Sequence, residues 1–235
     1  MNASDLSNSL PELRGVIFDL DGVIVDSHAA HQTAWRTFLQ TLGREVPQSE
    51  LDFILDGRKR NDILRHFLGE LTEEELTLHG QCKNRIFDQM QAEVAPVGGV
   101  IPLIHELRQN RVALAVATSA SRSRTHATLA HHGIEECFRV VVTAEDVISG
   151  KPDPAVYRLA AHKLGEPTET LLAIEDAISG VQAAIGAGLL CLAVASHQSR
   201  LSLLAAGACD AVPDFTQISV WELMRMHQGC SVGLK

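Results

Sequence analysis

Two aspartates, Asp19 and Asp21, lie two residues apart at the end of the apolar run Gly15–Phe18. The run is typical of a short buried strand, and side chains at positions i and i+2 of a strand share one face. Two carboxylates this close repel each other unless a proton or a cation lies between them. Because both offer only oxygen ligands, the pattern predicts a divalent ion, with Mg²⁺ preferred. A simple Asp-Gly turn at Asp21-Gly22 is the alternative interpretation.

Polar side chains also follow directly after two later apolar runs. Thr118 and Ser119 follow one run, and Glu175 and Asp176 follow another. Such runs alternate with helical patterns, which predicts an α/β fold with a parallel sheet covered by helices on both faces. These sheets carry their functional groups at the carboxyl ends of the strands. The expected strands are residues 16–20, 112–117, 140–142, 171–174 and 189–195, and the expected helices are residues 122–132, 154–163, 177–187 and 199–206.

The segment from residue 27 to residue 95 has no strand-like run, and helical patterns dominate it. We therefore expect a helical domain, residues 27–95, inserted into a core formed by residues 1–26 and 96–235. Thr72 followed by Glu75 fits a capping box. The helices expected in the insertion are residues 28–42, 50–55, 61–68 and 72–93.

Lys151 lies in the run Gly150-Lys151-Pro152-Asp153-Pro154, where two prolines restrict the backbone beside it. The run is not a Walker A loop, because Pro152 replaces the required Ser or Thr. A solvated surface lysine is the alternative for Lys151, and a helix cap is the alternative for Asp176.

Taken in order, these motifs resemble those of the haloacid dehalogenase superfamily over about residues 15–200. The first motif is Asp19-Leu-Asp-Gly-Val-Ile-Val-Asp26-Ser27, and Thr118, Lys151 and the Glu175/Asp176 pair match the second, third and fourth. The resemblance implies a Rossmann-like core, an inserted α-helical cap, Mg²⁺ and phosphoryl transfer.

The resemblance also assigns roles to individual residues. Asp19 would attack phosphorus, and Asp21 would protonate the leaving oxygen and later accept a proton. The remaining core groups would bind the phosphoryl oxygens. The expected catalytic residues are Asp19, Asp21, Thr118 and Lys151. The expected Mg²⁺ ligands are Asp19, Asp21, Glu175 and Asp176.

The inserted helices resemble the cap of β-phosphoglucomutase and its phosphatase relatives. His31 and Trp35 have the spacing of that group, and Arg60 and Lys83 occupy its Arg and Lys positions. A surface histidine and a solvated basic turn are the alternatives here. The sequence lacks the Lys-Asn that the mutase carries after its Ser-Ala-Ser, as do many plain phosphatases. The expected substrate-binding residues are Gly22, Ser27, His31, Arg60, Lys83, Ser119 and Ala120.

Composition excludes other classes of function. The net charge of −9 argues against nucleic acid as a partner, since phosphate backbones require clustered Lys and Arg. Five widely spaced cysteines without C-x-x-C indicate neither a disulfide framework nor a cysteine-based zinc site. The polar N-terminus is not a signal peptide, and no apolar stretch could span a bilayer. We expect a cytoplasmic protein without membrane contact, a monomer with a dimer left open.

These observations predict a Mg²⁺-dependent phosphatase that hydrolyses a small phosphorylated metabolite, a sugar phosphate, through an aspartyl-phosphate. A mutase of the β-phosphoglucomutase type is the alternative, because it would share every core residue. A non-catalytic module that binds phosphorylated ligands is a third hypothesis. The intact set of Asp19, Asp21, Lys151 and Asp176 argues against it.

Overall fold

The computed structural model describes residues 12–232, apart from the side chains at positions 49, 52, 92, 231 and 232. Most of the polar N-terminal segment discussed above therefore lies outside the described residues. The described chain contains a six-stranded parallel sheet in the order β3-β2-β1-β4-β5-β6. The strands are β1 (Gly15–Phe18), β2 (Ala113–Ala117), β3 (Val140–Val142), β4 (Leu171–Glu175), β5 (Leu190–Val194) and β6 (Asp210–Val212).

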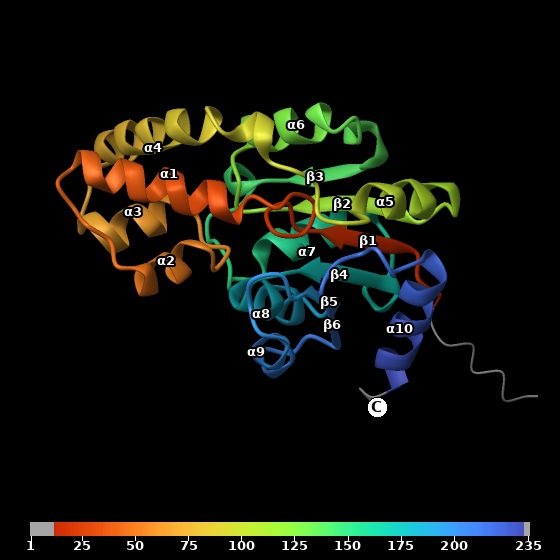
Figure 1. The fold of residues 1–235 in the computed structure, drawn as a ribbon. Coiled ribbons are helices and arrows are strands. Elements are labelled where there is room, and N and C mark those ends of the chain that lie inside the picture. The colour runs from red at the N-terminus through yellow and green to blue at the C-terminus, as the bar shows by residue number, and fades with distance from the viewer. Residues whose placement is uncertain (1–11, 233–235) are drawn as a thin grey trace, which may run out of the picture.

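Alternation along the strands supplies two apolar faces, each covered by helices (Figure 1). Phe18 contributes to one face and its neighbour Ile17 to the other, because successive side chains point to opposite sides of a strand. The first face packs against α5 (Val100–Gln109), α6 (Arg122–His131) and α10 (Val220–Val232). The second face packs against α7 (Ala155–Leu164), α8 (Ile178–Gly186) and α9 (Arg200–Ala205). The α/β prediction is confirmed.

The pairing of the central strands determines where the sequence motifs lie in the structure. β1 pairs with β2 on one side and with β4 on the other, and Phe18 lies in register with Val116 and Ile174. The order of strands reverses at β1, and ligands of such sheets bind at the carboxyl ends beside this reversal. The residues that follow β1, β2 and β4 consequently emerge at one edge.

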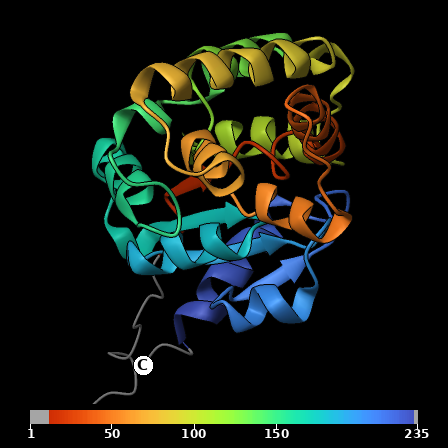
Figure 2. The ribbon, with the colours of Figure 1, turned by 90° about the vertical axis from the view of Figure 1, so that its left-hand side faces the viewer.

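Four helices form a separate layer beside that edge (Figures 1 and 2), and the arrowheads of β1 and β4 point toward this layer in Figure 1. This helical unit consists of α1 (His28–Thr41), α2 (Gln48–Ile54), α3 (Arg60–Leu68) and α4 (Glu73–Asp88). It encloses its own apolar cluster, which includes Trp35, Phe38 and Leu64. The expected capping box of Thr72 and Glu75 starts α4.

Short 3₁₀ turns complete the described structure at Gln91–Glu93, Glu135–Cys137, Ala144–Asp146 and Thr168–Thr170. The helix expected over residues 72–93 ends earlier, at Asp88, and residues 91–93 form a separate 3₁₀ turn. The expected pattern omitted α5, β6 and α10. β6 has only three residues, too few for a visible alternation, and α5 contains a proline at position 102. Within residues 12–232, no helix has both the length and the apolar character needed to cross a bilayer.

Candidate active site

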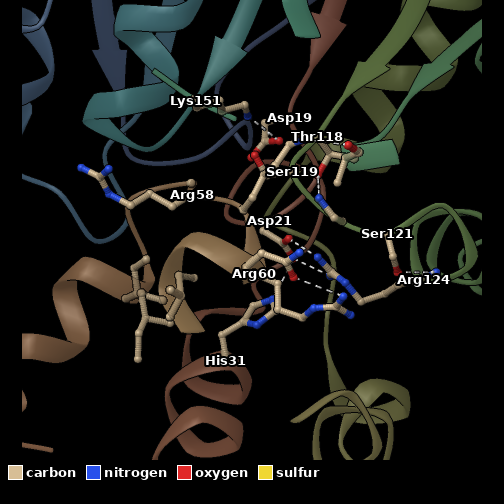
Figure 3. A pocket seen from close by; sticks show the side chains of 18 of the residues that line it. Asp19, Asp21, His31, Arg58, Arg60, Thr118, Ser119, Ser121, Arg124 and Lys151 are labelled. Atoms are coloured by element: carbon tan, nitrogen blue, oxygen red, sulfur yellow. Dashed lines mark hydrogen bonds and ion pairs between the residues drawn. The ribbon is translucent and has the colours of Figure 1, made fainter. Parts of the chain in front are cut away.

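Asp19 is buried directly after β1, and it faces the ammonium group of Lys151 (Figure 3). Lys151 Nζ lies 2.9 Å from Asp19 Oδ1, and both side chains are less than a tenth exposed. Thr118 follows β2 and Asp176 follows β4, so the parallel sheet brings these groups to the same edge. The sheet thus places a carboxylate and a cation together at the end of its central strand.

Glu175 holds Lys151 from the other side. Lys151 Nζ donates to Glu175 Oε1 over 2.5 Å, and the Tyr157 hydroxyl donates to the same oxygen over 2.8 Å. Glu175 Oε2 accepts the backbone N–H groups of Asp176 and Ala177 at 2.9 and 3.2 Å. Both oxygens of Glu175 are therefore occupied by protein donors, an arrangement that favours orienting Lys151 over direct contact with a ligand.

Gly180 makes this arrangement possible. A Cβ atom built at position 180 would lie 2.0 Å from the carboxyl carbon of Glu175. Gly22 has a similar role beside Asp176, since its φ is +76° and a Cβ there would lie 2.1 Å from Asp176 Oδ2. Only glycine fits such a conformation and such a close approach without displacement. Gly22 thus shapes the site by leaving room for the Asp176 carboxylate.

Asp19, Glu175 and Asp176 form a carboxylate cluster whose ligand oxygens lie within 4.8 Å of one another. Burial, together with the charges of Glu175 and Asp176, raises the pKa of Asp19 to about 8, against the lowering effect of Lys151. Burial also raises the pKa of Asp176 to about 6, although His28 and Lys151 lower it. A single lysine leaves these buried acids undercompensated, and all their donors are oxygens. The cluster therefore fits a hard divalent cation such as Mg²⁺.

Asp21 points away from Lys151 and binds Arg124 instead (Figure 3). Arg124 donates from Nη1 and Nη2 to the two carboxylate oxygens of Asp21 over 2.8 and 2.5 Å. Ser27 donates to Oδ1 over 2.6 Å. Burial alone would raise the pKa of Asp21, but the Arg124 guanidinium outweighs burial and holds it well below its ordinary value. Asp21 is consequently an ionised carboxylate in this conformation.

The segment after β2 forms a tight turn that leads into α6. The Thr118 hydroxyl oxygen accepts the N–H of Ala120 over 3.0 Å, and Ser121 caps α6 by accepting the N–H of Arg124. Thr118, Ser119 and Ala120 all line the same cavity as Asp19. The free hydroxyl protons and the start of a helix favour an anion at this position.

The helical unit contributes His31 and Lys83 to the opposite wall. His31 Nε2 lies 3.3 Å from Asp21 Oδ1, and its Nδ1 lies 3.1 Å from Lys83 Nζ. Burial and the charge of Lys83 lower the pKa of His31 to about 3, and burial and Arg124 lower that of Lys83 to about 7. Lys83 also lies over the rings of Trp35 and Phe87, at 5.4 and 4.8 Å from their centres.

Three consecutive basic residues at the start of α3 point in different directions. Arg58 turns outward to pair with Asp56, whereas Arg60 points toward Arg124 (Figure 3). Lys59 donates to the carbonyl oxygens of Ala144, Val147 and Ile148 over 2.8, 2.6 and 3.0 Å. Lys59 therefore joins the helical unit to the loop after β3.

A second contact joins the helical unit to the core at α8. The Ser179 hydroxyl, in α8, donates to the carbonyl oxygen of Asp56, and the Ser179 N–H donates to Asp56 Oδ1 over 3.2 Å. The helical unit and the core enclose a cavity of about 250 Å³. Of the residues expected at the site, the cavity is lined by Asp19, Asp21, His31, Arg60, Lys83, Thr118, Ser119, Ala120, Lys151 and Asp176, while Gly22, Ser27 and Glu175 support it from behind.

Arg124, His28, Tyr157 and Lys59 belong to this arrangement and were missed in the sequence. Tyr157 is the single tyrosine of the chain, and it is fully buried against Glu175. His28 Nε2 lies 2.8 Å from Asp176 Oδ2. Burial lowers the pKa of His28, but the hydrogen bond to Asp176 and the neighbouring carboxylates outweigh it and raise the pKa. Of these four residues, only Tyr157 offered a signal in the sequence, because it is the single tyrosine of the chain.

Comparisons with known proteins identify the family of the chain. The family model of haloacid dehalogenase-like hydrolases matches residues 16–194. The chain is 30% identical over 215 residues to validoxylamine A 7′-phosphate phosphatase of Streptomyces hygroscopicus subsp. limoneus, covering 86% of this chain and 94% of that protein. It is also 30% identical over 214 residues to a phosphorylated carbohydrates phosphatase of Thermotoga maritima, covering 85% of this chain and 94% of the relative.

A solved structure shares the fold. The β-phosphoglucomutase of Clostridium difficile matches with a TM-score of 0.84 at 24% identity, over 94% of this chain and 99% of the other. The chain belongs to the haloacid dehalogenase-like hydrolase family, as the sequence motifs predicted. It is a hydrolase.

Proposed function

We propose that this protein is a Mg²⁺-dependent phosphatase that hydrolyses a sugar phosphate through an aspartyl-phosphate at Asp19. One observation carries the proposal: a buried carboxylate at the end of β1 lies 2.9 Å from a buried lysine and opens into a cavity of about 250 Å³. Its walls carry Arg60, Lys83 and Arg124 although the whole chain has a net charge of −9. Local positive charge of this kind suits a small anionic ligand.

The carboxylate cluster supplies the place for the cation. Asp19 and Asp176 would hold Mg²⁺ together with oxygen from the Asp21 position, and Glu175 would keep Lys151 in place beside them. The bound ion would neutralise charge between the nucleophile and the phosphoryl oxygens. The raised pKa values of Asp19 and Asp176 fit this assignment, because a cation would restore their ionised forms.

In the first half-reaction, an oxygen of Asp19 attacks phosphorus and the bond between phosphorus and the sugar oxygen breaks. Lys151 and Thr118 stabilise the charge on the phosphoryl oxygens. Asp21 gives a proton to the departing sugar oxygen. In the second half-reaction, Asp21 takes a proton from water, the resulting hydroxide oxygen bonds to phosphorus, and the bond to Asp19 breaks.

Asp21 must carry a proton before it can act as the acid. The bidentate contact with Arg124 opposes this, because it keeps the Asp21 carboxylate ionised. A bound anion draws the Arg124 guanidinium toward itself and releases the carboxylate. Arg124 thus couples the protonation of Asp21 to substrate arrival.

The helical unit acts as a cap that closes over the substrate. Lys59 and Asp56 hold it against the core in the conformation described here. Arg60 lies against Gly80, where a Cβ would be 2.5 Å from its Cζ, and its side chain lines the cavity. Arg60 and Lys83 bind the distal end of the sugar phosphate.

The relatives support a sugar phosphate as substrate. The two proteins named above are phosphatases whose names specify validoxylamine A 7′-phosphate and phosphorylated carbohydrates. The mutase alternative rests on the shared core residues, the resemblance of the inserted helices and the β-phosphoglucomutase fold, which matches at 24% identity. Segment 119–123 lacks the Lys-Asn pair of the mutase, which favours water as the acceptor.

Release of inorganic phosphate from a panel of sugar phosphates tests the proposal. We expect turnover that EDTA abolishes and Mg²⁺ restores, and that Asp19→Asn lowers by at least about 10³-fold, the scale for losing a nucleophile. Isomerisation of β-glucose 1-phosphate without phosphate release would favour the mutase. No turnover of any phosphate ester would favour a binding module.

A further inference from the structure

A second cluster of metal-ligating side chains lies next to the carboxylate cluster, on the other side of the His28 ring. It consists of Asp26 and His28, at the start of α1, and His197, in the loop after β5. Asp26 Oδ1 lies 3.9 Å from His28 Nδ1 and 3.4 Å from His197 Nε2. Within the described residues, these three groups offer ligand atoms that all lie within 4.8 Å of one another. They come from two separate segments of the chain.

His28 supplies the observation that points to a ligand. Its side chain is only 4% exposed, and Nδ1 is buried with no hydrogen-bond partner among the described residues. The other ring nitrogen, Nε2, lies 2.8 Å from Asp176 Oδ2 and donates its proton to that oxygen. A neutral imidazole with its proton on Nε2 carries a lone pair on Nδ1. Asp26 Oδ1 lies 3.9 Å from this nitrogen, and the His197 ring packs against the His28 ring with centroids 3.7 Å apart.

Metal-bound histidines typically have this arrangement, with one nitrogen on the metal and the other donating to a carboxylate. We propose that Asp26, His28 and His197 bind a transition-metal ion, with Zn²⁺ as the best fit. Two imidazole nitrogens and one carboxylate oxygen suit Zn²⁺, Co²⁺ or Ni²⁺ better than Mg²⁺. Bond lengths of about 2.0–2.1 Å place tetrahedral ligand atoms roughly 3.4 Å apart. The separations from Asp26 Oδ1 are 3.4 Å to His197 Nε2 and 3.9 Å to His28 Nδ1.

A metal site also needs access for the ion and for water, and two of these side chains are exposed to solvent. The Asp26 side chain is 60% exposed and that of His197 is 37% exposed, so an ion can enter from solvent and keep water as a further ligand. The ion would connect the entry to the helical unit with a loop of the core. This site is distinct from the carboxylate cluster. The contact between His28 and Asp176 connects the two.

Calorimetric titration with Zn²⁺ tests the proposal on tag-free, metal-stripped protein in a buffer with saturating Mg²⁺. We expect one Zn²⁺ per chain, and His197→Ala should weaken the affinity by at least about tenfold, since even the outer partners of metal ligands are worth about 10- to 100-fold. Asp26→Asn should also weaken it. His162→Ala, an exposed histidine on α7, is the matched control and should leave affinity unchanged.

Visible absorption of the Co²⁺-loaded protein gives a second readout. Nitrogen ligation at low coordination number should give bands in wild type and His162→Ala that His197→Ala loses. Equal Zn²⁺ affinity in wild type and His197→Ala would place the ion elsewhere and overturn the proposal, as would absence of binding in wild type. Neither measurement depends on turnover, so failure of the proposed phosphatase activity would leave the result readable.

Discussion

The raised pKa of Asp19 predicts an unusual pH dependence of stability. With a folded pKa of about 8 and an ordinary value of 3.8, folded Asp19 keeps a proton that the unfolded chain has lost between these pH values. The free energy of unfolding of the metal-free protein should therefore fall as pH rises through this window. At about 1.4 kcal/mol per pH unit, Asp19 contributes up to about 4 kcal/mol between pH 5 and 8. Sharing of the proton with Asp176 reduces this to about 2–4 kcal/mol.

Asp19→Asn removes this titration and preserves the size of the side chain. Urea unfolding in EDTA at pH 5 and at pH 8 would give the stability of wild type and variant. The variant should gain about 2–4 kcal/mol relative to wild type on going from pH 5 to pH 8. His31 titrates in the opposite direction below pH 6.5, and comparison of the two proteins cancels its contribution.

Two controls make the result specific. Glu169→Gln removes an exposed carboxylate far from the site and should show no such gain. Saturating Mg²⁺ should stabilise wild type more than Asp19→Asn, and most strongly at pH 8, because the ion binds the ionised carboxylates. A wild-type-to-variant difference that stays constant within about 0.5 kcal/mol from pH 5 to 8 would refute the reasoning about the buried cluster.

Three further predictions concern turnover. Asp21→Asn should slow hydrolysis of a sugar phosphate far more than hydrolysis of p-nitrophenyl phosphate, because the p-nitrophenolate leaving group needs no acid. Equal losses of rate on the two substrates in steady-state assays would contradict the role of Asp21 as the acid. Lys59→Met should raise KM for the sugar phosphate by about 5- to 30-fold, the value of roughly 1–2 kcal/mol from a partly buried ammonium on three carbonyls. An unchanged KM would mean that Lys59 does not hold the closed form. Arg60→Ala should lower kcat/KM for the sugar phosphate by about 10- to 100-fold and leave turnover of p-nitrophenyl phosphate nearly unchanged. Equal effects on both substrates would mean that Arg60 supports the folded structure and does not bind the sugar phosphate.

The core of the site was predictable because a parallel sheet brings the carboxyl ends of its strands together. Asp19, Thr118 and Asp176 each follow an apolar run, and the register of β1 with β2 and β4 places them at one edge. Gly22 was expected to bind substrate. In the structure it makes room for Asp176, a packing role that depends on a φ of +76° that no spacing reveals.

Partners from distant segments were not predictable. Arg124 reaches Asp21 across 103 residues because Ser121 starts α6 beside the end of β1. Arg58, Lys59 and Arg60 look equivalent in sequence, yet α3 begins at Arg60 and Lys59 has an extended backbone. The three side chains therefore diverge to Asp56, to the carbonyls of the loop after β3, and to the cavity. Such divergence depends on where a helix begins.

Chemical trapping of the phosphorylated enzyme tests the central role of Asp19 most directly. Wild-type protein would be mixed with a turned-over sugar phosphate and Mg²⁺, quenched in acid within one turnover, digested and analysed by mass spectrometry. The mechanism predicts one added phosphoryl group on the peptide that contains Asp19, and none on that peptide from Asp19→Asn. Phosphate carried by another residue, or Asp19→Asn turning over at a rate near that of wild type, would contradict it.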